Sequence, residues 1–135
     1  MAGANVELLN GLALAYVGDA IYEVYIRDHL ISRGLTKPKR LHQKATHYVS
    51  AKAQAHMMEM LLAEGKLNEA ESEIYHRGRN AKSHTSAKNA DIVTYRVATG
   101  FEALLGYLHL TGQTKRLEEL VARCIRLVED ENEKQ

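Results

Sequence analysis

Residues 12–26, LALAYVGDAIYEVYI, are apolar at nearly every position and carry only two formal charges, Asp19 and Glu23. A helix built from this stretch is apolar on almost all of its faces, so we expect it to lie at the centre of the fold. A carboxylate in such a helix is costly to desolvate unless a cation or a hydrogen-bond donor meets it. Asp19 therefore needs a partner.

Helical patterns also dominate the rest of the chain, which has a single proline and no run of alternating β-branched residues. Pro38 suits the first turn of one helix, and Ser50 and Asn68 suit the N-caps of two others. We predict an all-α fold, a helical bundle forming one domain over residues 1–135, with a frayed tail at about 128–135. The predicted helices cover residues 5–14, 17–32, 36–48, 51–62, 68–78, 89–110 and 117–128.

Composition narrows the class of protein. A chain of 135 residues fits one compact domain, and its 18 Lys and Arg nearly balance its 17 Asp and Glu, so net charge alone does not argue for nucleic acid. Cys124 is the only cysteine, which excludes an intrachain disulfide, suits a reducing cytoplasm and indicates a packing residue. The N-terminus has no basic leader, and no apolar run is long enough to span a membrane. We expect a soluble cytoplasmic protein with no membrane partner.

Cations concentrate in two segments. Lys37, Lys39, Arg40 and Lys44 share the exposed face of one predicted helix, and residues 77–88, RGRNAKSHTSAK, form a predicted basic loop. Such a loop is either a solvated turn or a contact for a phosphate backbone, and the pattern leaves both interpretations open. The candidate RNA contacts are Lys37, Lys39, Arg40, Arg77, Arg79, Asn80, Lys82, Ser83, His84 and Lys88.

A second lone carboxylate stands far along the chain. Glu102 is the only formal charge from Val97 to Leu110, and Gly100 and Gly106 in the same predicted helix indicate a neighbouring backbone that comes close. Two such helices packed around one hard cation would show this pattern, and Mg²⁺ prefers oxygen ligands. The alternative is that each acid pairs with an arginine of the core or caps a backbone group. The available arginines are Arg27, Arg96 and Arg123.

Three segments resemble those of a known family. LAYVGDAIYEVYI (14–26) is similar to the signature helix of ribonuclease III, typically LEFLGDAVL, and ATGFEALLGYLHLTG (98–112) is similar to that family's second motif, ADVFEALIGALYLDGG. YVSAKAQA (48–55) resembles the intervening helix. The chain most resembles the Mini-ribonuclease III branch of the family, because of its short length, the missing double-stranded-RNA-binding domain and the stretch HRGRNAKS (76–83).

The resemblance implies Mg²⁺-dependent hydrolysis of double-stranded RNA, which leaves 5′-phosphate and 3′-hydroxyl ends, with precursor 23S ribosomal RNA as the substrate. It leaves open whether a ribosomal protein assists by shaping that substrate. It also implies a homodimer formed through the signature helix. The expected interface residues are Tyr16, Ile21, Tyr22 and Tyr25.

The family's motifs also assign the site, with two departures. Ala15 and Thr99 stand where typical members have Glu and Asp, so the carboxylates left to hold the metal are Asp19 and Glu102. Thr99 and Glu23 are candidates for orienting water around it. Because half of the acidic charge is missing, a non-catalytic RNA-binding module with the same fold is the alternative interpretation.

Overall fold

The structure, a computed structural model, describes residues 5–82 and 91–133. Every regular element in those ranges is helical, as predicted. As predicted, Pro38 lies in the first turn of its helix, and Ser50 and Asn68 are N-caps. The prediction of separate helices over residues 5–14 and 17–32 is wrong, because this part of the chain forms a 3₁₀ turn over residues 6–8 and one helix over residues 11–32. The elements are the 3₁₀ turn η1 (Val6–Leu8) and the helices α1 (Gly11–Ser32), α2 (Pro38–Val49), α3 (Ala51–Ala63), α4 (Glu69–Arg79), α5 (Ile92–Leu110) and α6 (Thr114–Glu133).

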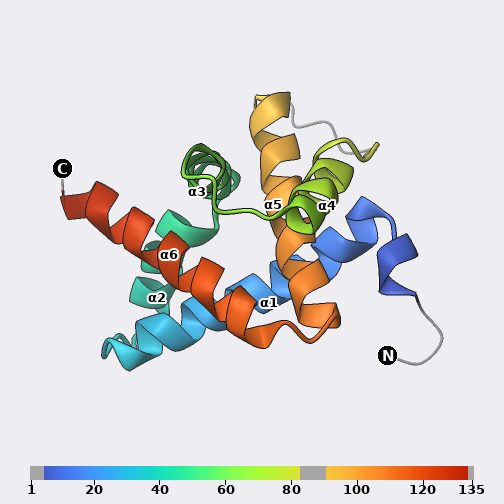
Figure 1. The fold of residues 1–135 in the computed structure, drawn as a ribbon. Coiled ribbons are helices and arrows are strands. Elements are labelled where there is room, and N and C mark those ends of the chain that lie inside the picture. Colours follow the sequence, from blue (N-terminus) through green and yellow to red (C-terminus); the bar gives the residue numbers. More distant parts are fainter. Residues whose placement is uncertain (1–4, 83–90, 134–135) are drawn as a thin grey trace.

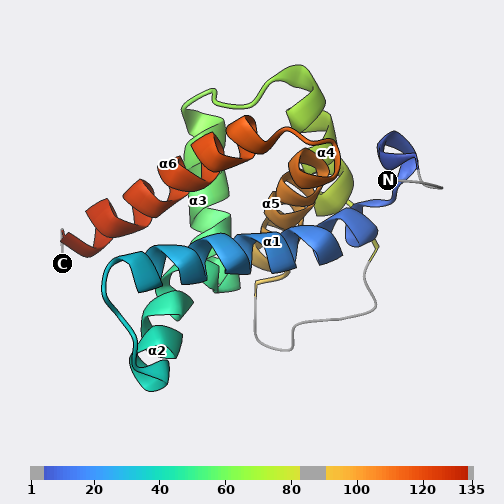
Figure 2. The ribbon, with the colours of Figure 1, turned by 90° about the horizontal axis from the view of Figure 1, so that it is seen from below.

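Helix α5 is the centre of the bundle. It lies between α3 and α4 in Figure 1, and α1 crosses it in Figure 2. From Val97 to Leu108 every residue of α5 is buried except Glu102. The central helix thus has a single break in its apolar surface, and that break is a carboxyl group.

Two glycines set the distance between α1 and α5. A Cβ on Gly18 would lie 1.7 Å from the carbonyl oxygen of Glu102, and one on Gly106 would lie 2.0 Å from that of Leu14. A Cβ on Gly100 would lie 2.7 Å from the ring of Tyr75 on α4 and 2.8 Å from its carbonyl oxygen. The close backbone approach predicted for Gly100 and Gly106 is confirmed, and α1 and α5 pack with no side chain between them at the crossing.

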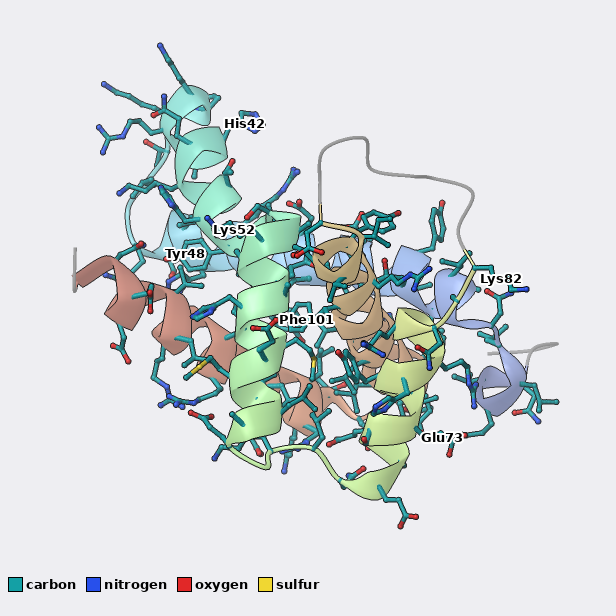
Figure 3. The ribbon with its side chains drawn as sticks, turned by 90° about the horizontal axis from the view of Figure 1, so that it is seen from above. His42, Tyr48, Lys52, Glu73, Lys82 and Phe101 are labelled. Atoms are coloured by element: carbon teal, nitrogen blue, oxygen red, sulfur yellow. The ribbon has the colours of Figure 1, made fainter. Side chains whose placement is uncertain are left out.

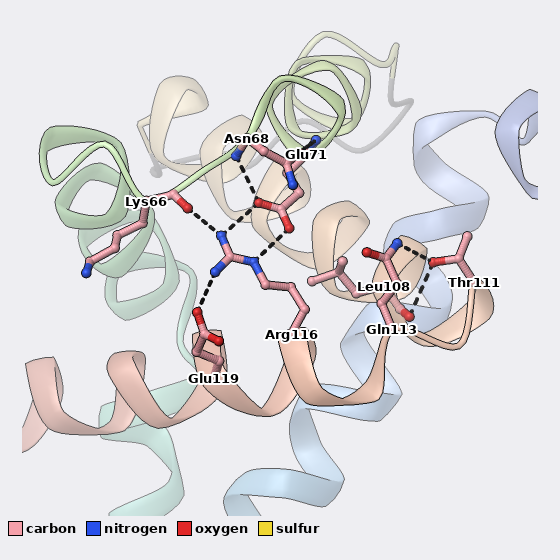
Figure 4. A network of polar contacts seen from close by, with 8 residues as sticks. All are labelled: Lys66, Asn68, Glu71, Leu108, Thr111, Gln113, Arg116 and Glu119. Carbon is pink, nitrogen blue, oxygen red and sulfur yellow. Dashed lines mark hydrogen bonds and ion pairs between the residues drawn. The ribbon is translucent and has the colours of Figure 1, made fainter.

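A buried ion pair joins α4 to α6 (Figure 4). Glu71 accepts hydrogen bonds from Nε and Nη2 of Arg116 at 2.8 and 2.9 Å, and it also completes a capping box with Asn68. Burial alone would raise the pKa of Glu71, but the hydrogen bonds from Arg116 and from the backbone of Asn68 hold that pKa below its usual range. The charged pair has hydrogen-bond partners on both sides, as a buried pair requires.

The predicted frayed tail is wrong for residues 128–133, which continue α6. Val128 is buried, and one carboxylate oxygen of Glu129 lies 2.9 Å from Nε2 of His29 and accepts hydrogen bonds from Tyr48 and Arg33 at 3.2 and 3.3 Å. These contacts anchor the end of α6 to α1 and α2. The local charge pattern along the tail does not reveal them.

Cys124 and the methionines of α3 are core residues. Cys124, Met57 and Met58 are fully buried, which confirms the packing role expected for the cysteine. Burial raises the pKa of the Cys124 thiol to about 12. None of the helices in the described part of the chain is long and apolar enough to cross a membrane.

Candidate active site

The crossing of α1 and α5 brings Asp19 and Glu102 together. Gly18, next to Asp19, packs on the backbone of Glu102, and the two carboxyl groups are near enough to share a hydrogen bond. Asp19 is exposed and Glu102 is half-buried. The expectation that Asp19 is desolvated is therefore wrong, because its side chain is exposed beside the crossing, and only Glu102 is shielded.

The shielding changes the acidity of Glu102. Burial raises its pKa to about 8, helped by the hydrogen bond and charge of Asp19 and by the charge of Glu23, while the side-chain amide of Gln54 acts in the opposite direction. At neutral pH and without a cation, the Glu102 carboxyl therefore keeps a proton. A positive partner close to the pair would favour the ionised form of both carboxyl groups.

That partner is not an arginine of the chain. Among the described residues, no ion pair includes Asp19 or Glu102. Of the three arginines available to them, Arg27 pairs with Glu23 at 3.2 Å, Nε of Arg123 donates to Glu64 at 3.0 Å, and Arg96 is exposed. The alternative of a pairing with core arginines is wrong.

A third side chain reaches this pair. Nε2 of Gln54 on α3 donates to Oε2 of Glu102 at 3.5 Å and to the carbonyl oxygen of Val49 at 3.1 Å. Gln54 is buried, and its Oε1 has no hydrogen-bond partner among the described residues. Gln54 was not predicted from the sequence, although one signal was available: it is a lone amide among the apolar residues of α3.

The two positions where the family has further acids are closed to solvent. Ala15 and Thr99 are buried, and the hydroxyl of Thr99 donates to the carbonyl oxygen of Tyr95 at 3.0 Å. Thr99 can thus orient a water only as an acceptor. Glu23, one turn after Asp19, is held by Arg27 and contributes charge to the site.

The donor set fits a hard divalent cation. Asp19 and Glu102 offer oxygen atoms only, which Mg²⁺ prefers over nitrogen and sulfur. No cluster of three or more His, Cys, Asp or Glu suited to a metal occurs in residues 5–82 and 91–133. Two carboxylates hold such an ion only if waters or phosphate oxygens complete its shell.

Basic side chains cover α2, one end of the molecule. From His29 to Met58 the sequence has six Lys and Arg and no Asp or Glu. Lys37, Lys39 and Arg40 are exposed, and Figure 3 shows α2 projecting beyond the other helices. This part of the RNA-contact prediction agrees with the exposure of the residues.

The predicted basic loop at 77–88 is partly wrong. Residues 77–79 belong to α4, and the guanidinium of Arg77 donates to the carbonyl oxygens of Glu7 and Leu9 at 2.7 and 3.1 Å and to the carboxylate of Glu73 at 3.1 Å. Arg77 is therefore a structural residue that joins α4 to the N-terminal segment. Its guanidinium is engaged by acceptors within the chain and is not free to contact RNA.

Of the other candidates from this segment, the structure describes Arg79, Asn80 and Lys82. Arg79 is half-exposed and donates to Asn80, which ends α4, and Lys82 is exposed. In Figure 3, Lys82 and the His42 end of α2 lie on opposite sides of Phe101. The remaining predicted contacts, Ser83, His84 and Lys88, lie outside the described residues.

The surface expected to form the dimer is also revised. Tyr22 is fully buried, donates its hydroxyl proton to the carbonyl oxygen of Tyr48 at 2.9 Å and packs edge-on against Phe101, so its place in an interface is wrong. Ile21 and Tyr25 are partly buried against the core. Tyr16, by contrast, is 83% exposed.

Tyr16 belongs to an exposed row that was not predicted from the sequence. Leu12, Tyr16, Ala20 and Val24 follow one another at intervals of four residues, which places them on one face of α1, and all four are exposed. Asp19 lies beside this apolar row. Asp19 and the exposed row therefore share the exposed surface of α1.

The chain resembles known proteins over most of its length. Residues 12–113 match the ribonuclease III domain family. Proteins called Mini-ribonuclease 3 from Enterococcus faecalis and Streptococcus pneumoniae are 69% and 62% identical to it, over 93% of this chain and 96% and 98% of theirs. A crystal structure of a Fusobacterium nucleatum protein superposes with a TM-score of 0.77 at 27% identity, covering 88% of this chain and 93% of that one.

Proposed function

This chain belongs to the ribonuclease III family, in its Mini-ribonuclease 3 group of endoribonucleases acting on double-stranded RNA, and on this premise we propose that it cleaves with Mg²⁺ held by Asp19 and Glu102. The observation that carries the proposal is the carboxyl pair at the α1–α5 crossing. Glu102 would give up its proton when it binds a cation there, and Asp19 faces solvent, where a phosphate can approach.

In this reaction, the residues of the chain bind the metal ion and orient it. Mg²⁺, when bound, neutralises charge on the phosphate and makes water a better nucleophile. Glu102 would hold the ion from the central helix and Asp19 would hold it from the exposed side, while Glu23 adds negative charge that favours a cation. The membership of the Mini-ribonuclease 3 group favours this enzyme over the non-catalytic RNA-binding module.

The basic surfaces support a long duplex as the substrate. Helix α1 has 22 residues and is about 33 Å long. Lys82 follows α4, which packs on the start of α1, and α2 follows the end of α1, so cations lie toward both ends of the helix that carries Asp19. Double-stranded RNA is recognised mainly through its phosphates, 2′-hydroxyls and shape. By its family resemblance, we propose the ends of precursor 23S ribosomal RNA as the natural site.

The proposed function is tested with a precursor-23S stem, a matched single strand of the same length, and Mg²⁺ or EDTA, with and without large-subunit ribosomal proteins. We expect the duplex to be cleaved and the single strand to stay intact, and we expect cleavage only with Mg²⁺. The products should have 5′-phosphate ends. Asp19→Asn serves as the site variant. Cleavage in EDTA, equal cleavage of the single strand, or a fully active Asp19→Asn protein would each contradict the proposal.

The apolar row of α1 supports a homodimer. A row of exposed apolar side chains, Leu12, Tyr16, Ala20 and Val24, is unusual on a monomer and typical of an interface. A two-fold contact along it uses the same residues from both copies. Because Asp19 lies beside the row, such a dimer presents two carboxyl pairs close to its seam.

Replacing Tyr16 with Asp is expected to separate the dimer, because a charge at the centre of an apolar seam is desolvated without a partner. We expect the dissociation constant to rise by at least about 100-fold, measured by sedimentation equilibrium. Leu62→Asp is the control, since Leu62 is an exposed apolar residue on α3 outside the row. A Tyr16→Asp protein as dimeric as the control would rule out this seam.

Replacing Lys37, Lys39 and Arg40 together with Ala is expected to weaken duplex binding in EDTA and to reduce its salt dependence. Each lost phosphate contact lowers the slope of log K against log salt by about 0.9, so the slope should fall by roughly 2 to 3. Fluorescence anisotropy with a labelled duplex measures both quantities. The control removes Lys115 and Arg126, two exposed cations of α6. Equal slopes for the two variants would show that α2 does not contact RNA.

A further inference from the structure

Gln54 is a polar side chain in an apolar place. It is 3% exposed, and the other buried residues of α3 are Ala55, Met57, Met58 and Leu61. Its amide nitrogen has two acceptors, Val49 and Glu102, whereas Oε1 has none among the described residues. The nitrogen of the amide is thus satisfied, and its oxygen is not.

The hydrogen bond to Val49 gives Gln54 a structural role at the end of α2, but it does not account for the unpartnered Oε1. A buried acceptor without a partner costs about 1–3 kcal/mol, while methionine has a similar shape and fills neighbouring positions of α3 at no polar cost. Turning the amide over does not help, because the Val49 carbonyl oxygen only accepts hydrogen bonds and requires the N–H side. Oε1 therefore points away from the Val49 carbonyl oxygen, while Nε2 of the same amide contacts both Val49 and Glu102.

We infer that Gln54 is a positioning residue of the active site: its N–H fixes the carboxylate of Glu102, and its Oε1 accepts a hydrogen bond from a water that enters with the divalent cation. The inference rests on the proposed role of Glu102 as a metal ligand. Such a water would satisfy this unpartnered buried acceptor, whose amide contacts Glu102.

The same inference accounts for the reduced set of acids. Typical members of the family have carboxylates where this chain has Ala15 and Thr99, and the hydroxyl proton of Thr99 is already donated to Tyr95. An amide oxygen from α3 supplies a lone pair to the site without adding a third negative charge beside Asp19 and Glu102. Gln54 thus supports the water shell from a different helix and with a neutral group.

The test measures Mn²⁺ binding to the full chain by electron paramagnetic resonance, together with the Mg²⁺ concentration that gives half-maximal cleavage. In Gln54→Met we expect the Mn²⁺ dissociation constant and this Mg²⁺ concentration both to rise about tenfold, the usual effect of losing a residue that orients a metal ligand, with an equal or higher melting temperature. Met58→Leu, one turn away on α3, controls for repacking and should leave both values unchanged. Gln54→Leu repeats the test if the methionine variant does not fold.

Two results separate this inference from the proposed function. Wild-type Mn²⁺ binding in Gln54→Met or Gln54→Leu, with weakened binding in Glu102→Gln, overturns the role of Gln54 and leaves the metal site in place. Unchanged binding in Glu102→Gln overturns the metal site itself. A lower melting temperature in Gln54→Met with unchanged Mn²⁺ binding means that Gln54 is only a structural residue.

Discussion

Glu102→Gln is expected to slow RNA cleavage by at least about 10³-fold. It is also expected to stabilise the metal-free protein at pH 8. The amide cannot replace the charge that anchors the cation. It also removes a carboxyl whose pKa is about 8 in the folded chain because it is buried beside Asp19, far above the usual value for glutamate.

The direction of the pH dependence follows from that raised pKa. A carboxyl that binds its proton more tightly in the folded chain stabilises the fold fully below its unfolded pKa of about 4.3, and this contribution is lost as pH rises to about 8. Wild-type protein in EDTA should therefore lose stability across this window, while Glu102→Gln does not. We expect the variant to exceed the wild type by about 1–3 kcal/mol at pH 8.

Chemical unfolding in EDTA at pH 5, 6.5 and 8 measures this difference. The control is Glu59→Gln on the exposed side of α3. Mg²⁺ should then stabilise the wild type and leave Glu102→Gln unchanged, because a ligand that binds only the folded state raises its stability. A difference between variant and wild type that does not grow with pH would contradict the buried carboxyl.

Gly18→Ala is expected to destabilise the fold more than any surface change, by about 3–5 kcal/mol. Its new Cβ would lie 1.7 Å from the Glu102 carbonyl oxygen, which is a backbone atom that cannot rotate away. The two central helices must separate, and the site at their crossing separates with them. Denaturant unfolding and cleavage should both show the loss.

Gly65→Ala is the matched control for Gly18→Ala. Gly65 follows α3 and has a φ of +64°, and a Cβ added there would have no neighbouring atom within 4 Å, so only the backbone strain of about 1 kcal/mol remains. Similar unfolding free energies for the two variants would show that the crossing tolerates a methyl group.

The helices could be predicted because their signals are local. Ser50 and Asn68 cap the helices that follow them, Pro38 begins its own helix, and Gly106 is anomalous within an apolar helix. The carboxyl pair could be predicted because each acid interrupts an apolar run. In these cases the information lies within a few residues of the feature.

The orientation of α1 could not be predicted in the same way. Tyr16 and Tyr22 stand in the same apolar run, yet one is exposed and the other forms the core with Phe101. When both faces of a helix are apolar, periodicity does not show which face meets the bundle. The partners of Arg77 are equally hidden from the sequence, because two of them are backbone carbonyl oxygens about 70 positions away.

The burial of Cys124 has a practical consequence for following this protein in solution. Its thiol stays protonated at neutral pH and out of contact with solvent, so it reacts poorly with maleimides and does not form disulfides between copies. A cysteine placed at the exposed Gln43 of α2 would then be the single reactive thiol of each copy. The wild-type chain already serves as a background for one-dye fluorescence experiments on the approach of an RNA duplex to α2.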